Sequence, residues 1–257
     1  MTERLKGKVV IVTGGGGGIG GATVELCCEE GARVAVVDAD REAAETIASG
    51  LGQSALPVAA DLRLEEDCER AVAQTVSAFG AIDCLANVAG VRVWGPIPAA
   101  TRESWSSILE GNLLSAAYCS KFAVPKMAEH GGGSIVNVSS ANAIVGRKGM
   151  AQYDASKSAM LALTRAMACD HAEQGIRVNA VCPGPTLTMY HARRRAQSKG
   201  ISIEEAEAEL RQAGAPATLL QRQASPREIA YAILFLLCDE SSYVTGATFM
   251  IDGGLSV

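Results

Sequence analysis

The stretch that decides the fold is KVVIVTGGGGGIGGATVELCCEEGARVAVVD, residues 8–38. It begins with an apolar run, VVIVT at 9–13, which ends at glycines, as expected of a strand buried on both faces of a sheet. We expect a helix from about Gly20 to Glu30, ended by Gly31, and a second strand at 33–38. The stretch therefore predicts a strand–helix–strand unit, the building block of a parallel sheet.

The same alternation of short β-branched runs and longer helical patterns continues to the end of the chain. Further strands are expected at 56–60, 82–86, 134–139, 177–182 and 247–251, and further helices at 41–50, 65–79, 102–129, 152–174 and 225–238. No internal repeat or linker divides the sequence. We therefore expect one α/β domain over residues 1–257, a doubly wound parallel sheet (Rossmann fold) with helices on both faces. Ligands of such a sheet bind beyond the carboxyl ends of its strands.

Composition and charge exclude several classes of protein. The 257 residues are 48% hydrophobic and 20% charged, which is typical of a globular chain. The net charge of −5 argues against nucleic acid as the main partner, because phosphate binding needs a concentrated basic face. No apolar run approaches the roughly 18 residues that span a bilayer, and the polar start MTERLKGK is unlike a secretory signal. We expect a cytoplasmic protein with no membrane attachment.

The eight cysteines and three histidines give no sign of a metal site or of disulfides. The cysteines are scattered through apolar or helical segments, with no C-x-x-C pair, and the histidines have no ligand spacing. Free, reduced thiols and no bound metal are the expectation.

The glycine-rich loop between the first strand and the first helix is a candidate phosphate site. Glycines let the backbone approach a pyrophosphate, and the helix N-terminus offers free N–H groups. The pattern G-x-G-x-x-G starts at Gly15 or at Gly16, and so long a glycine run meets it almost automatically. A flexible turn is the alternative, but the position inside a strand–helix–strand unit favours phosphate.

Acidic and polar residues end the next three strands. Asp38 ends the second strand near the spacing of the acid that binds an adenosine ribose, which favours NAD over NADP; the alternative is that Asp38 or Asp40 caps the next helix. Arg41 nearby weakens that preference. Asp61 ends the third strand, where it can meet the adenine amino group. Asn87 ends the fourth, where it can tie neighbouring strands or touch the cofactor ribose.

The strongest functional signal is Ser140 followed by Tyr153 and Lys157. Tyr153 and Lys157 are four residues apart on an expected helix, so both side chains lie on one face. A free tyrosine has a pKa of about 10, but a neighbouring ammonium and the positive ring of an oxidised nicotinamide favour tyrosinate. The pair can then take a proton from an alcohol while hydride leaves its carbon. An isolated Tyr-x-x-x-Lys occurs by chance in many helices.

Together these motifs resemble those of the short-chain dehydrogenase/reductase family, over nearly the whole chain. The residues that match are Thr13, Gly14, Gly18 and Gly20 in the glycine loop, Asn87 to Gly90 after the fourth strand, and Ser140, Tyr153 and Lys157. Asn112 matches the asparagine whose helix kink holds a water in the proton relay. Of the adjacent serines, Ser139 is expected to be structural. The segment Leu220–Gln223 departs from the family, whose members often carry glycine around the arginine.

The resemblance implies a catalytic set and a cofactor-binding set. The catalytic set is Asn112, Ser140, Tyr153 and Lys157. The cofactor-binding set is Gly14, Gly17, Gly18, Ile19, Gly20, Asp38, Asp61, Leu62, Asn87, Ala89, Gly90, Tyr153, Lys157, Pro183, Gly184, Thr186 and Thr188. The implied activity is NAD-dependent interconversion of a secondary alcohol and a ketone by a homotetramer. The alternatives are a catalytically silent NAD-binding regulator and an isomerase or dehydratase with tightly held cofactor.

The substrate is a small molecule whose identity the residues do not give. Candidate contacts are Arg92, Trp94, Ser140, Asn142, Arg147 and Tyr190, a set that suits a carbon skeleton with an anionic group. Arg193 to Arg195 are expected to form a solvated helix face instead. The polar excursion at about 185–224 is expected to be a mobile lid or a rigid helix pair at an oligomer contact.

Overall fold

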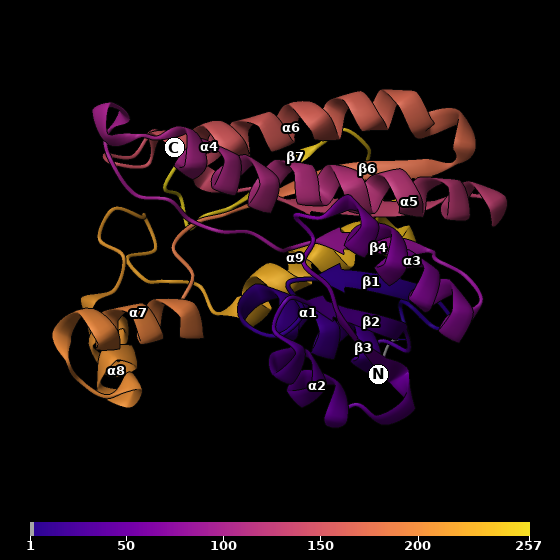
Figure 1. The fold of residues 1–257 in the computed structure, drawn as a ribbon, viewed down its shortest axis with the longest axis horizontal. Coiled ribbons are helices and arrows are strands. Elements are labelled where there is room, and N and C mark those ends of the chain that lie inside the picture. The colour runs from indigo at the N-terminus through magenta and orange to yellow at the C-terminus, as the bar shows by residue number, and fades with distance from the viewer. Residues whose placement is uncertain (1–2) are drawn as a thin grey trace.

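The computed structural model describes residues 3–257, so the first two residues of the predicted domain lie outside it. Its strands are β1 (Val9–Thr13), β2 (Arg33–Asp38), β3 (Ala55–Ala59), β4 (Cys84–Asn87), β5 (Gly133–Val138), β6 (Ile176–Pro183) and β7 (Thr248–Ile251). They form a parallel sheet in the order β3-β2-β1-β4-β5-β6-β7 (Figure 1). Successive strands are added on one side of β1 up to β3 and on its other side from β4 onward, so the strand order reverses between β1 and β4. This topology confirms the predicted Rossmann fold.

Helices cover both faces of the sheet. They are α1 (Gly18–Glu29), α2 (Arg41–Ser49), α3 (Glu65–Phe79), α4 (Arg102–Leu109), α5 (Ser115–Glu129), α6 (Ala151–His171), α7 (Met189–Lys199), α8 (Ile203–Ala213) and α9 (Pro226–Leu237). Alternate residues of a strand point to opposite faces. Val10 and Val12 therefore pack with α1, α2 and α9, whereas Ile11 packs with α3, α5 and α6. Within residues 3–257, no helix combines the length and the apolar character that crossing a bilayer requires.

Local sequence signals explain where the helices begin and end. Asp40 caps α2, since its carboxylate accepts a hydrogen bond from Ala43 N. Ser225 and Glu228 form a reciprocal capping box at the start of α9, where Pro226 takes the first helical position. Asp40 is thus occupied as a cap, and the second acid of this segment, Asp38, lies outside the helix.

The single helix expected at 102–129 is interrupted. A π-helical turn, Glu110–Leu114, separates α4 from α5. The turn is anchored by Asn112, whose Nδ2 donates to Ser156 Oγ (2.9 Å) and whose Oδ1 accepts from Val91 N (2.7 Å). Such insertions occur often at functional sites. Pro125 lies inside α5 without ending it.

The excursion between β6 and α9 folds as a helix pair. Figure 1 shows α7 and α8 packed on one another and set apart from the two helical layers. Glu209 of α8 accepts from Arg195 and from Lys199 of α7, both at 2.7 Å. The pair is therefore held together by its own contacts, and it is joined to the sheet through the segment after Pro183.

Candidate active site

The glycine-rich loop has a backbone that only glycine allows at two positions. Gly14 has a φ of +65°, and a Cβ there would lie 2.9 Å from Ala89 Cα. A Cβ on Gly20 would lie 2.0 Å from Gly14 O, so the start of α1 packs directly on the loop. At Gly17, the N-cap of α1, a Cβ would meet nothing within 4 Å. The loop thus presents bare backbone and a helix N-terminus to open space, which suits a pyrophosphate.

Asp38 holds the loop in place from the end of β2. Its Oδ2 accepts from Gly16 N (2.9 Å) and its Oδ1 from Asp40 N (3.0 Å). Arg41 faces Glu45 on its own helix, at 3.8 Å. The charged group that contacts the loop is therefore the carboxylate of Asp38, whereas Arg41 is paired with Glu45.

Thr13 joins the ends of β1 and β4. Its buried hydroxyl accepts from Val88 N (3.0 Å) and from Ala89 N (3.1 Å). These two bonds fix the backbone that leads to Gly90. The loop after β4 is thereby held against the glycine-rich loop.

Asn87 ties strands together and carries an unused acceptor. Its Nδ2 donates to Asn137 Oδ1 on β5 (2.9 Å) and to Ser120 Oγ on α5 (3.3 Å). Its Oδ1 is buried and has no hydrogen-bond partner among residues 3–257. A buried acceptor without a partner is costly, which makes this atom a candidate contact for a bound ligand.

Asp61 and Leu62 lie just beyond β3, on the same edge of the sheet. Arg63 donates to both oxygens of Asp61, at distances that include 2.9 Å and 2.5 Å. This pairing lowers the pKa of Asp61. Leu62 is buried in the core beneath. The carboxylate is therefore ionised at neutral pH and already has a partner on one side.

Lys157 is a buried ammonium next to the cofactor edge of the sheet. Its Nζ donates to Val138 O (2.9 Å) and lies 6.0 Å from the Tyr153 ring centroid. A Cβ on Gly90 would be 3.3 Å from that Nζ. Burial, and next the charge of Arg92, lower the pKa of Lys157 to about 8. The amine is still mostly protonated at neutral pH, with N–H groups left for a ligand.

The two serines after β5 have different roles. Ser139 is buried, and its hydroxyl donates to Lys157 O (2.7 Å), so it fixes helix α6 against β5. Ser140 Oγ instead accepts from Asn142 N (3.2 Å). Since that bond uses a lone pair, the hydroxyl proton of Ser140 remains available to another acceptor.

Arg92 brings a second cation to Tyr153. Its guanidinium carbon lies 5.4 Å from the Tyr153 ring centroid, and its Nη1 is 2.9 Å from His191 Nε2. Because a guanidinium can only donate, His191 Nε2 accepts, and the ring proton is on Nδ1. Nδ1 then donates to Thr188 Oγ1, 2.9 Å away. Burial, followed by Arg92, lowers the pKa of His191 to about 4, so the ring is neutral.

Two further arginines lie over the ring of Trp94. The guanidinium carbon of Arg194 lies 4.5 Å from the Trp94 ring centroid, and that of Arg147 lies 5.6 Å from it. Trp94 itself is 42% exposed. Tyr190, also exposed, packs edge-on against His191 with ring centroids 5.5 Å apart. The loop after β4, the loop after β5 and helix α7 therefore meet around these rings.

The loop after β5 is fixed to α6 by Asp154. Its Oδ1 accepts from Asn142 Nδ2 (2.8 Å) and its Oδ2 from Arg147 N (3.0 Å). The amide nitrogen of Asn142, a predicted substrate contact, is therefore already engaged. Arg147 is held by its backbone, which leaves its side chain free to reach Trp94.

The end of β6 leads past the glycine loop into α7. Gly184 packs on Asp252, where a Cβ would come within 2.6 Å of the backbone. Thr186 is buried and its hydroxyl donates to Gly184 O (3.1 Å). The Thr188 methyl group lies 3.5 Å from where a Cβ on Gly18 would be. Thr188, at the end of this segment, therefore adjoins the glycine-rich loop.

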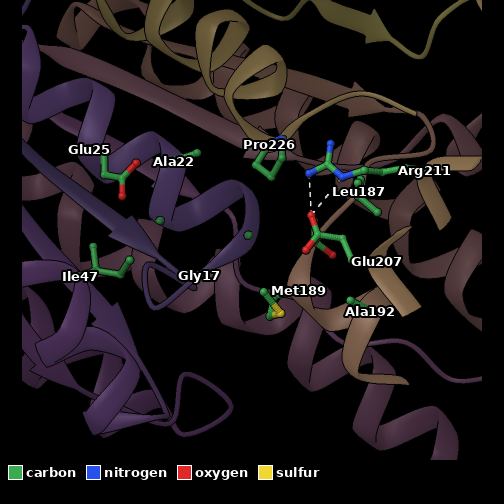
Figure 2. Close-up of a pocket in the computed structure, with 13 residues that line it drawn as sticks. Gly17, Ala22, Glu25, Ile47, Leu187, Met189, Ala192, Glu207, Arg211 and Pro226 are labelled. Atoms are coloured by element: carbon green, nitrogen blue, oxygen red, sulfur yellow. Dashed lines mark hydrogen bonds and ion pairs between the residues drawn. The ribbon is translucent and has the colours of Figure 1, made fainter. Parts of the chain in front are cut away.

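A cavity of about 330 Å³ lies between this segment and the outer side of α1. Figure 2 shows Gly17 and Ala22 on one wall and Met189 and Ala192 of α7 on another. Glu25 of α1 and Glu207 of α8, which is paired with Arg211, line it together with Gly17 and Gly18 of the glycine-rich loop. The cavity therefore lies between α1 and the α7–α8 pair.

Sequence reasoning missed three residues of this site. His191 and Arg194 were not among the predicted site residues, and Asp154 was passed over beside Tyr153. A threonine at the start of a helix followed by histidine three residues on would have pointed to the Thr188–His191 pair. Arg194 is exposed, as expected of residues 193–195, but its guanidinium also lies over the ring of Trp94, which the sequence did not indicate. That contact joins distant segments and leaves no local pattern.

The chain is similar to known oxidoreductases over nearly its whole length. A family profile described as Enoyl-(Acyl carrier protein) reductase matches residues 14–256. An uncharacterized oxidoreductase of Thermotoga maritima is 38% identical, with 97% of each chain covered. The 2-(S)-hydroxypropyl-CoM dehydrogenase 3 of Xanthobacter autotrophicus is 37% identical over 100% of this chain and 99% of its own. The ligand-free structure of Thermoplasma acidophilum aldohexose dehydrogenase superposes with a TM-score of 0.88 and 31% identity, covering 100% of this chain and 96% of the other.

Proposed function

The chain belongs to the short-chain dehydrogenase/reductase family, and we propose that it is an NAD-dependent enzyme that interconverts a secondary alcohol and a ketone. That it is an oxidoreductase of this family follows from its relatives; the cofactor, the substrate class and the roles of residues are our proposal. The observation that carries it is the Lys157 ammonium, whose Nζ lies 6.0 Å from the Tyr153 ring centroid and so close to Gly90 that a Cβ added there would be 3.3 Å away.

The residues at the carboxyl edge of the sheet fit a dinucleotide. Bare backbone at Gly17 and Gly18 suits the pyrophosphate, and the unpaired Oδ1 of Asn87 suits a hydroxyl donor. We assign the adenine end to Asp61 and Leu62 and the nicotinamide end to Lys157. The remaining contacts of the site are Gly14, Ile19, Gly20, Ala89, Gly90, Pro183, Gly184, Thr186 and Thr188. Bound NAD supplies the hydride acceptor of the reaction.

Asp38 favours NAD over NADP. A carboxylate that already accepts from Gly16 N and Asp40 N adds negative charge beside the position of the ribose. It can accept hydrogen bonds from ribose hydroxyls, whereas a 2′-phosphate would be repelled. Arg41 is paired with Glu45 on its own helix, at 3.8 Å.

In the oxidation direction Tyr153 removes the alcohol proton. The ammonium of Lys157 and the guanidinium of Arg92, 5.4 Å from the ring, stabilise the negative charge on the phenol oxygen. Ser140 donates its free hydroxyl proton to the substrate oxygen and holds it in place. The alcohol loses a hydride from carbon and a proton from oxygen, so the products are the ketone, reduced cofactor and one proton.

Asn112 completes the route of that proton toward solvent. Both polar atoms of its side chain have protein partners. Its side chain therefore fixes the π-helical turn against the loop after β4 and against α6, next to Gly90 and Lys157. Asn112 is a positioning residue in this scheme.

Helices α7 and α8 form a lid over the nicotinamide end. The cavity of about 330 Å³ between this pair and α1 leaves room for a closing movement. Hydrogen exchange at 185–224 should slow when NAD binds, and unchanged exchange would argue for a rigid pair. Light scattering tests the proposed homotetramer, and cell fractionation the proposed cytoplasmic location.

The activity is tested by following cofactor absorbance with a panel of secondary alcohols and both NAD and NADP. Steady NADH formation supports a dehydrogenase, and a higher kcat/KM with NAD than with NADP supports the role of Asp38. No turnover of any alcohol would favour the silent regulator. Product formed without net NADH would favour an isomerase or dehydratase that retains its cofactor.

A further inference from the structure

The substrate side of the site is strongly cationic, although the chain as a whole carries a net charge of −5. Arg92 lies over Tyr153, and Arg147 and Arg194 lie over Trp94. The three arginines come from three segments that are distant in sequence: the loop after β4, the loop after β5 and helix α7. The pKa of His191 is lowered by burial first, then by the charge of Arg92, and after it by those of Arg194 and Arg147. All three guanidinium groups therefore lie near His191.

These guanidinium groups are not neutralised within the protein. None of the ion pairs formed within residues 3–257 includes Arg92, Arg147 or Arg194. Asp154, the carboxylate in contact with the loop after β5, accepts hydrogen bonds from Asn142 Nδ2 and Arg147 N, one on each oxygen. The partner of Arg92 is a neutral imidazole. Arg147 and Arg194 are exposed, so the cluster presents an unpaired positive charge to solvent that attracts an anionic ligand.

The neighbouring arginines of α7 provide a contrast. Arg195 is paired with Glu209, and Arg193 lies exposed on the outer side of the helix. Arg194 alone of the three turns to the Trp94 ring. The clustering is therefore specific to the side that faces Tyr153 and does not follow from a basic helix.

We infer that Arg92, Arg147 and Arg194 bind an anionic group of the substrate, so that the enzyme acts on a secondary alcohol bearing a carboxylate, sulfonate or phosphate. This rests on the proposed function, whose reacting group it places at Tyr153. The guanidinium carbons of Arg194 and Arg147 lie 4.5 and 5.6 Å from the Trp94 ring centroid, and guanidinium groups can form bidentate hydrogen bonds to planar or tetrahedral oxyanions. Arg92 links this cluster to the reacting group, because it lies over the Tyr153 ring and hydrogen-bonds His191, whose pKa is also lowered by Arg194 and Arg147.

The test compares alcohols that differ only in charge. A series of secondary alcohols with a terminal carboxylate and increasing chain length is paired with the corresponding amides, and kcat/KM is measured for each pair with NAD. The variants are Arg147→Gln and Arg194→Gln, with Arg193→Gln as the matched control from the same helix. We expect the wild type to prefer the acids. Each cluster variant should lower the acid-to-amide ratio about tenfold, while Arg193→Gln leaves it unchanged.

Equal use of acids and amides by the wild type would overturn the anion site while leaving the dehydrogenase intact. A ratio unchanged in both cluster variants would overturn it as well. If neither series reduces NAD, the proposed function fails. The anion site is then tested separately, by a binding measurement. A Trp105→Phe background then leaves Trp94 as the sole tryptophan. Quenching of its fluorescence by the carboxylates, lost in Arg147→Gln, supports the site, and equal quenching by the amides refutes it.

Discussion

Replacing Lys157 by methionine should make the protein more stable and, at the same time, inactive. The residue is 4% exposed, and within residues 3–257 its Nζ donates one hydrogen bond, to Val138 O at 2.9 Å. Methionine keeps a similar length and shape without the charge. The variant therefore separates the cost of burying an ammonium from the packing of the residue.

The magnitude follows from the pKa of the buried amine. Burial and Arg92 lower it from 10.5 to about 8. Each pH unit corresponds to about 1.4 kcal/mol, so folding with a charged Lys157 costs about 3 kcal/mol at neutral pH. Loss of the hydrogen bond to Val138 O offsets about 1–2 kcal/mol of this. The net gain of about 1–2 kcal/mol raises Tm by about 2–8 °C in a chain of this size.

The gain must depend on pH. Below about pH 8, Lys157 is charged in both the folded and the unfolded state, so the folded wild type bears the full cost. Between about 8 and 10.5 the unfolded chain keeps the proton that the folded protein has lost, so the wild type becomes more stable as pH rises. The difference between variant and wild type should therefore shrink toward pH 10.

Thermal unfolding across this pH range measures the effect. Lys6→Met is the control, because the Lys6 side chain is 71% exposed and its removal should change Tm little at any pH. A Lys157→Met protein that is less stable than the wild type at pH 7, or whose advantage does not fall with pH, would refute this reasoning.

Three further predictions concern the edges of the site. Thr13→Val leaves the N–H groups of Val88 and Ala89 without their acceptor and should cost about 2–4 kcal/mol of unfolding free energy in urea, against less than about 1 kcal/mol for Thr13→Ser. His191 has a pKa lowered to about 4, so the wild type should lose stability as pH falls from 6.5 to 4, by about 3 kcal/mol, and His191→Gln should show a flatter profile; equal slopes would count against a buried neutral ring. Asp38→Ala should raise the KM for NAD about tenfold with kcat nearly unchanged and increase the relative use of NADP, and an unaltered NAD-to-NADP ratio would reject its role.

The sheet was predictable because its signals are local. The run VVIVT at 9–13 is buried at every position, and the glycines after it stand where the chain must turn closely into α1. Capping residues such as Asp40 and Ser225 also announce their helices within a few residues. Periodicity and caps act over one or two turns, which a single sequence displays directly.

The π-helical turn and the arginine cluster were not predictable in this way. The residues at 102–129 have a continuous helical pattern, and the insertion at Asn112 depends on its bonds to Val91 and Ser156 in other parts of the chain. Arg194 likewise looks like a solvated residue until the exposed ring of Trp94 is brought next to it. Contacts of this kind are made by the folded topology, and no local pattern encodes them.

The most direct test of the account is hydride transfer in a single turnover by Tyr153→Phe. An alcohol that the wild type oxidises is mixed with the NAD complex of each protein, and cofactor absorbance is followed. We predict transfer at least about a hundredfold slower in the variant, with the Kd for NAD within about twofold of the wild type. Transfer at the wild-type rate by a variant that binds NAD normally would contradict the proposal that Tyr153 moves the proton.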